Sequence, residues 1–139
     1  MNARFASLAL CMAAMGCAMT QREPPPTPFA GTRWDVVLER PLPGEPPNFR
    51  FADGRMEGFG GCNRVEAPYV QDTIGARAIA LRRLQVDNQP CDAAAKAVEM
   101  RVLSVLQSVS SYSITADVMT MNGSAGALTL RAHGQETKR

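Results

Sequence analysis

Four cysteines carry the most evident chemistry in this 139-residue chain, because a thiol can be acylated, oxidised to a disulfide or bound to a metal. They are Cys11, Cys17, Cys62 and Cys91. A zinc site needs about four nitrogen or sulfur ligands, and the chain offers one histidine, His133, near its far end. We therefore expect no metal, and look to acylation and oxidation instead.

The first two cysteines lie in a segment typical of a secretion signal. Arg4 precedes an apolar run of roughly 11 residues, which is too short to span a bilayer. The run leads into Ala-Met-Gly-Cys at residues 14–17, which resembles the lipobox of bacterial lipoproteins, with alanine at the place of the usual leucine. We predict a lipoprotein signal peptide over residues 1–16 and lipidation at Cys17. Ordinary cleavage near Ala18, leaving a free protein, is the alternative.

A lipidated amino terminus would attach the protein stably to a membrane. Residues 17–29 include three consecutive prolines and read as an extended, proline-rich tether. We expect a bacterial envelope protein that faces the periplasm. Ala18 is not the aspartate that retains lipoproteins in the inner membrane of enteric-type bacteria, which favours the outer membrane.

The other two cysteines are expected to pair. If Cys11 leaves with the leader and Cys17 carries lipid, Cys62 and Cys91 remain. An even remainder in an exported protein predicts one disulfide. Closing a loop of about 30 residues stabilises a fold by about 3–4 kcal/mol in the chain-entropy model.

Neither the charge nor the remaining polar residues point to a catalytic or nucleic-acid site. Fifteen basic residues against 13 acidic ones leave a net charge of +2, whereas nucleic-acid binding favours a basic run or face. The serines near residues 104–113 lack a nucleophile-elbow pattern, and the aspartates fall at turns or caps. We expect no enzyme, no catalytic residue and no cofactor.

Alternating hydrophobicity predicts strands in the first half of the folded part. Trp34, Val36 and Leu38 alternate with polar residues over 32–40, and Trp34 is expected in the core. Asp53-Gly54 between two alternating runs, 49–52 and 55–59, predicts a two-residue hairpin.

The next strands are less clear. Residues 65–70 have strand composition, but Pro68 favours an edge or a bulge. A turn is expected at 74–76. Residues 78–84 leave two phases open, with either Ala78, Ala80 and Leu84 or Ile79 and Leu81 facing the core.

One helix is predicted directly after Cys91, so a disulfide there would join its start to the hairpin strand. Asp92 can cap its first turn. An apolar stripe faces the sheet and comprises Ala95, Val98, Val102, Val105, Leu106 and Val109.

Short antiparallel strands close the chain. Residues 112–115 and 118–121 are joined at Ala116-Asp117, and Asn122-Gly123 is expected to turn into a strand at 127–131. Residues 133–139 read as a flexible tail.

Several of these pieces, taken in order, resemble the META domain, the family of the HslJ heat-shock lipoproteins. The Gly-Gly-Cys-Asn phrase is the most specific of them. The pieces are Gly-Thr-Arg-Trp at 31–34, Phe-Ala-Asp-Gly-Arg at 51–55, Gly-Phe-Gly-Gly-Cys-Asn-Arg at 58–64, Tyr69, Cys91 before a helix, and Leu-Thr-Leu at 128–130. Residues 65–68 and 87–90, on both sides of the expected disulfide, depart from the family pattern.

The resemblance implies a META (HslJ-like) domain over residues 30–132: β-rich α+β, a compact antiparallel barrel-like sheet with one α-helix packed on it. It also implies a link to heat shock and novobiocin resistance without enzymatic chemistry. We expect a monomeric, stress-related binding module that contacts envelope proteins. The alternative is a pilot-type lipoprotein whose barrel cleft binds an acyl chain or a partner peptide, which an apolar cavity lined by Val98 and Val102 would favour. Asn63, Arg64 and Tyr69 are possible binding residues, although for Asn63 we favour a structural role, with an unusual φ and bonds to nearby backbone.

Overall fold

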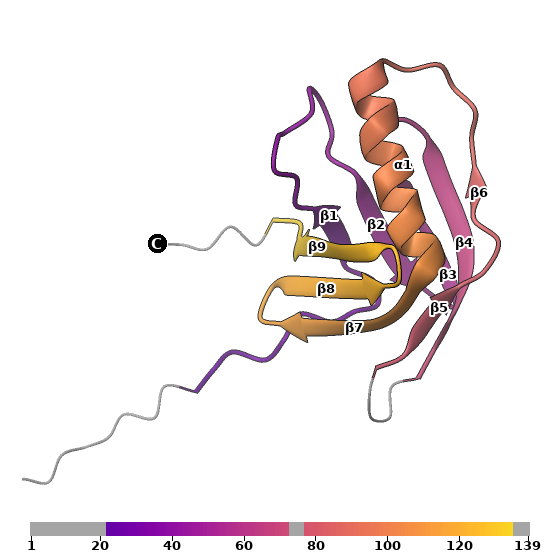
Figure 1. Cartoon of the computed structure of the whole chain (residues 1–139). Coiled ribbons are helices and arrows are strands. Elements are labelled where there is room, and N and C mark those ends of the chain that lie inside the picture. Colours follow the sequence, from indigo (N-terminus) through magenta and orange to yellow (C-terminus); the bar gives the residue numbers. More distant parts are fainter. Residues whose placement is uncertain (1–21, 73–76, 135–139) are drawn as a thin grey trace, which may run out of the picture.

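A computed structural model describes residues 22–72 and 77–134 of the chain as a curled antiparallel sheet with one helix against it (Figure 1). The elements in chain order are β1 (Arg33–Val36), β2 (Asn48–Ala52), β3 (Arg55–Phe59), β4 (Arg64–Gln71), β5 (Ile79–Leu81), β6 (Gln85–Val86), α1 (Ala93–Ser108), β7 (Val109–Thr115), β8 (Val118–Gly123) and β9 (Gly126–Ala132).

The sheet forms a nearly closed barrel. Its strand order is β5-β4-β3-β2-β1-β9-β8-β7, and β6 pairs with β4 beside this path. The two ends of the path meet where Ala78 bridges Ser111 and the Tyr112 N–H donates to the Arg77 carbonyl at 3.2 Å. Helix α1 packs against the barrel and contacts β5, β8 and β9 (Figure 1). The predicted fold class is confirmed.

The hairpin between β2 and β3 forms where the Asp-Gly pair predicts it. Asp53 and Gly54 both adopt positive φ, 50° and 76°, which is the geometry of a turn that follows the strand twist. Phe49 and Phe51 share one face and are fully buried, and Trp34 of β1 is fully buried beside them. The expected core role of Trp34 is therefore confirmed.

Phe29, the last residue of the expected tether, also packs on this core. Its ring centroid lies 4.5 Å from that of Phe51 and 4.7 Å from that of Tyr112. Its carbonyl accepts the indole N–H of Trp34 at 3.1 Å. The chain thus joins the barrel shortly before residue 30.

The middle strands differ in part from expectation. β4 lies inside the sheet, between β3 and β5, so an edge position for Pro68 is wrong. The Pro68 nitrogen points away from β3, toward the side on which β4 pairs first with β6 and then with β5. Pro68 lies between these two pairings, so the sheet needs no N–H donor from it there. In β5, Ile79 and Leu81 face the core. The turn expected at 74–76 lies outside the described residues.

The last turn is also displaced. Asn122 and Gly123 belong to β8, and the turn is made by Ser124 and Ala125. Gly123 is required for close packing and not for turning, because a Cβ there would lie 2.6 Å from the Ser108 carbonyl oxygen. Glycine marks both situations in a sequence, so the pattern predicted the wrong one.

The start of the expected tail is fixed to the barrel. The His133 N–H donates to the Arg33 carbonyl at 2.9 Å, and its ring contacts the Asp35 carboxylate at 2.6 Å. Residues 135–139 lie outside the described residues. Within the described part, the helix is neither long nor apolar enough to cross a membrane.

Gly58 offers a test of the β2–β3 pairing. A Cβ at this position would overlap the Asn48 carbonyl oxygen and come within 2.7 Å of the Phe49 ring. Gly58→Ala should lower the free energy of unfolding by about 3 kcal/mol, the upper end of typical overpacking costs. Chemical denaturation measures it. Gly44→Ala, where φ is 91° but nothing lies within 4 Å, should cost only about 1 kcal/mol of backbone strain. Equal costs for the two variants would contradict this packing.

Candidate functional site

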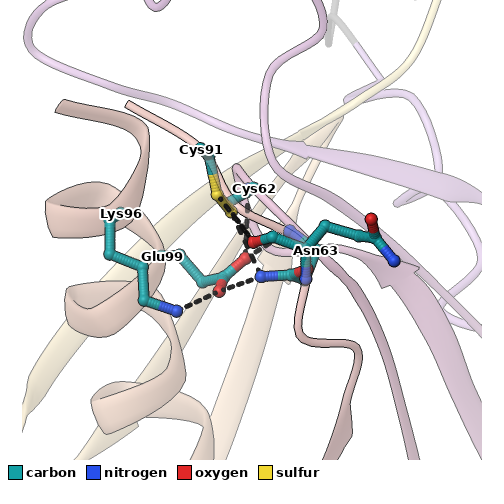
Figure 2. A network of polar contacts seen from close by, with 6 residues as sticks. Cys62, Asn63, Cys91, Lys96 and Glu99 are labelled. Carbon is teal, nitrogen blue, oxygen red and sulfur yellow. Dashed lines mark hydrogen bonds and ion pairs between the residues drawn. A yellow bond between two sulfur atoms is a disulfide. The ribbon is translucent and has the colours of Figure 1, made fainter. Parts of the chain in front are cut away.

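A disulfide joins the loop after β3 to the segment that enters helix α1. Cys62 and Cys91 are bonded, with their Cα atoms 6.0 Å apart (Figure 2). This separation lies in the ordinary range for disulfides. The pairing expected from the cysteine count is present, and it fixes the start of the helix beside the strand pair β3–β4.

A buried carboxylate lies directly beneath the disulfide. Glu99 of α1 is fully buried and points at the loop (Figure 2). Its Oε2 accepts the main-chain N–H groups of Cys62 at 3.0 Å and Asn63 at 2.5 Å, and its Oε1 accepts the Asn63 side-chain amide at 3.0 Å. Lys96, one turn earlier, lies 3.4 Å from Oε1. Three N–H donors and one ammonium group therefore hold one carboxylate.

These partners keep Glu99 charged despite its burial. Burial by itself would raise the pKa of the Glu99 carboxyl. Hydrogen bonds from the Asn63 side chain, from the main chain of Asn63 and Cys62, and from Lys96 favour the charged form and outweigh burial. The pKa of Glu99 consequently lies below its ordinary value, so the group is ionised at neutral pH.

Asn63 connects this carboxylate to the rest of the loop. Its side-chain oxygen accepts the Gln89 N–H at 2.6 Å, and its main-chain carbonyl accepts the Gly60 N–H at 2.8 Å. The residue is 2% exposed. The side chain thus holds two loops and the helix together, which matches the backbone-holding interpretation of Asn63.

The structure does not bring the three possible binding residues together. Arg64 is exposed on β4 and pairs with Glu66 at 3.0 Å. Tyr69, near the other end of the same strand, packs edge-on against the rings of Phe29 and Phe51. Cys17, the predicted lipidation site, lies outside the described residues. Among the residues described, no group of three or more side chains suited to a metal occurs.

Sequence reasoning missed Glu99. One signal was available, since the glutamate lies four residues after Ala95 and three before Val102, on the apolar stripe itself. A charged residue within such a stripe indicates a buried carboxylate with a partner. The rest of the stripe is confirmed at Val102, Val105, Leu106 and Val109, although Val109 already begins β7.

A surface groove lies beside the same helix. It has a volume of about 490 Å³ and is bounded by residues 36–40, by Val98, Arg101 and Val102 of α1, and by residues 127–129 of β9. Val36, Val102 and Leu128 give it an apolar base, and Arg40 and Arg101 are exposed at its rim. The groove includes Val98 and Val102, the two valines whose lining of an apolar cavity would favour the pilot-type alternative, and it is open to the surface.

The META domain family matches residues 27–136, most of the chain. The protein belongs to the META domain family. The match includes the loop of Cys62 and Asn63, the capped helix and all nine strands. The resemblance read from the sequence is therefore confirmed. A comparison with curated proteins finds no significant match.

Solved structures share the fold of this META domain at low sequence identity. A protein from Burkholderia xenovorans, studied by NMR, is 18% identical with a TM-score of 0.60, over 77% of this chain and 85% of that one. A DUF4847 family protein from Bacteroides vulgatus is 17% identical with a TM-score of 0.55, over 78% of this chain and 96% of that one. At such identities the similarity shows the fold alone.

Replacing Glu99 by glutamine tests the buried carboxylate. Glu99→Gln places an amide NH₂ among donors, and should lower the free energy of unfolding by about 1–3 kcal/mol at neutral pH. Because the folded-state pKa lies below the unfolded-state one, the stabilisation by Glu99 is complete above the unfolded pKa and is lost as the pH falls through the folded pKa. As the pH falls from about 6 to 3, the free energy of unfolding measured by chemical denaturation should decline less for Glu99→Gln than for wild type. The exposed Glu57→Gln is the matched control, and an unchanged decline in Glu99→Gln would refute the assignment.

Removing the disulfide should cost about 3–4 kcal/mol of unfolding free energy, because it closes a 29-residue separation. Cys62→Ser, Cys91→Ser and the double variant should lose similar amounts, since either single change already breaks the bond. Urea denaturation under non-reducing conditions measures the three losses. Additive losses would show that the cysteines act independently.

Proposed function

We propose that this META domain protein is a non-enzymatic, lipid-anchored module of the bacterial cell envelope that acts by binding other envelope proteins. Cys17 would carry the lipid and residues 17–29 would separate the domain from the membrane. The protein would face the periplasm from the outer membrane and act as a monomer. Membership of the META domain family, which the sequence resemblance links to heat shock, supports a role under envelope stress.

The Cys62–Cys91 disulfide is the observation that carries this proposal. Cys91 is exposed and Cys62 is only half-buried, so cytosolic reductants would reach the bond. A domain with such an accessible disulfide is suited to an oxidising compartment. Together with the lipobox-like residues 14–17, this supports export followed by anchoring.

The state of Glu99 supports a binding role over catalysis. An acid–base catalyst needs a group that exchanges protons with a substrate near the working pH. The Glu99 carboxylate is fully buried, is bonded to groups of the protein itself and has a lowered pKa. Its arrangement suits a structural carboxylate.

A second candidate function is favoured by the groove at Val98 and Val102. A pilot-type lipoprotein would hold an acyl chain or a peptide of its partner in such a cleft. The volume of about 490 Å³ falls within the usual range of ligand sites. This candidate is compatible with the first, because both act by binding at the envelope.

Membrane attachment provides the direct test. In a bacterial host, the wild-type chain should incorporate labelled fatty acid and sediment with membranes, whereas Cys17→Ser should do neither. Cys11→Ser is the matched control and should behave as wild type. Equal labelling of wild type and Cys17→Ser would contradict anchoring at Cys17.

The binding role requires a separate measurement. Lipidated protein captured from envelope extracts under non-reducing conditions should retain a specific companion protein. Added soluble domain should compete for this companion and release it. Companions that bind equally to the heat-unfolded protein would be non-specific. Recovery of nothing above that level would count against the binding role.

A further inference from the structure

Strand β9 has an open edge for half its length. Its ladder with β1 ends at the pair Val36–Leu130, followed by one bond from the Val37 N–H to the Thr129 carbonyl at 2.9 Å. β9 itself begins earlier, at Gly126, and pairs only with β8 over its first residues. Among the described residues, no strand pairs with this part of β9 on its other side.

The open edge presents main-chain groups in a known direction. Because Thr129 accepts from Val37, its peptide groups face away from β8, and alternate residues of a strand face the same way. The N–H and C=O of Ala127 therefore point into the groove, and Ala127 has no main-chain partner there in the described part of the chain. Unpaired groups of this kind are a template for one more strand.

The walls of the groove supply pockets and charge. Residues 36–40 form one wall and α1 forms the other, as the loop after β1 stands beside the helix in Figure 1. Val37 is 53% exposed although it is a large apolar side chain. Arg40 and Arg101 line the groove, and neither forms an ion pair with another described residue. Glu39 is the single acidic residue that lines the groove beside these two arginines, so the rim carries a net positive charge.

We propose that this groove binds an extended, apolar peptide segment with an acidic side chain, contributed by a partner protein and added as a strand to the open edge of β9. The inference rests on the proposed binding function and names its partner chemistry. Main-chain groups of Ala127 would pair with the peptide backbone. Its alternate apolar side chains would lie on Val98 and Val102, and its acidic side chain would meet Arg40 and Arg101.

The open edge favours a peptide over an acyl chain. A hydrocarbon tail would cover the N–H and C=O of Ala127 without hydrogen bonding to them, which is unfavourable for buried polar groups. A peptide strand satisfies them. The two arginines likewise fit a carboxylate on a side chain better than the middle of a hydrocarbon tail.

The test uses the full chain in detergent and a fluorescein-labelled, capped octapeptide pool. The pool alternates Val or Leu with Thr or Ser and has Asp at one fixed polar position. We expect saturable binding by fluorescence anisotropy. Replacing Asp by Lys in the pool should weaken binding about tenfold, the size of one charge-assisted contact.

Variants separate backbone pairing from other contacts. Ala127→Pro removes the groove-facing N–H and leaves the β8–β9 ladder bonds, so it should weaken binding at least tenfold. Ala127→Val retains the N–H and should stay within about twofold if the backbone is what the peptide recognises. Arg40→Glu and Arg101→Glu should reverse the preference between the Asp and Lys pools, and the exposed Arg82→Glu, outside the groove, should not.

Three results would overturn the proposal. They are no saturable binding up to millimolar pool, equal binding by Ala127→Pro and Ala127→Val, or no change of preference in the arginine variants. The arginine variants keep the test decisive if Ala127→Pro does not fold. Saturable binding of palmitate in place of the pool would assign the groove to an acyl chain. None of these results depends on fatty-acid labelling at Cys17, so failure of the groove proposal and failure of envelope anchoring are distinguishable.

Discussion

The contact between the Glu99 carboxylate and the main-chain N–H groups of Cys62 and Asn63 is the interaction on which the remaining features depend. A carboxylate without water is stable only if donors surround it, and the loop after β3 supplies them in fixed positions. The loop is also held by the Gln89 N–H on the Asn63 side chain and by its own Gly60–Asn63 main-chain bond. Helix and loop therefore determine each other's position, and the disulfide restrains the same junction covalently.

This interaction explains the Gly-Gly-Cys-Asn sequence at 60–63 residue by residue. A Cβ at Gly60 would lie 3.1 Å from the Glu99 side chain, so a larger residue would crowd the carboxylate. Gly61 has φ of 120°, a conformation that side chains disfavour, and this turns the next two N–H groups toward Glu99. Cys62 makes the covalent bond, and Asn63 connects the carboxylate to Gln89. Residues 60–63 therefore form a carboxylate-binding turn.

Local patterns predicted the elements, and long-range contacts decided the rest. Asp53-Gly54 and Asp92 act on neighbouring main-chain groups, so the hairpin and the helix start could be read from adjacent residues. Gly123 depends on Ser108, and the phase of β5 depends on which side the helix covers, neither of which is visible locally. Glu99 is the clearest case, because the loop N–H groups that it accepts lie 36 and 37 residues away. Cysteine pairing was easier to predict only because two cysteines remained.

The anchored helix also forms one wall of the groove. Glu99 lies between Val98 and Arg101 in sequence, so the contacts that fix Glu99 fix the groove wall within one helical turn. A side chain at Gly61 would lie 3.5 Å from Val98, which shows how closely the carboxylate-binding turn approaches that wall. A groove with one rigid wall loses less conformational entropy when it takes up a ligand than one that must order its helix first. Hydrogen bonds offset the cost of burying the Glu99 charge in this small domain. The same contacts would leave the proposed binding groove ordered before a peptide arrives.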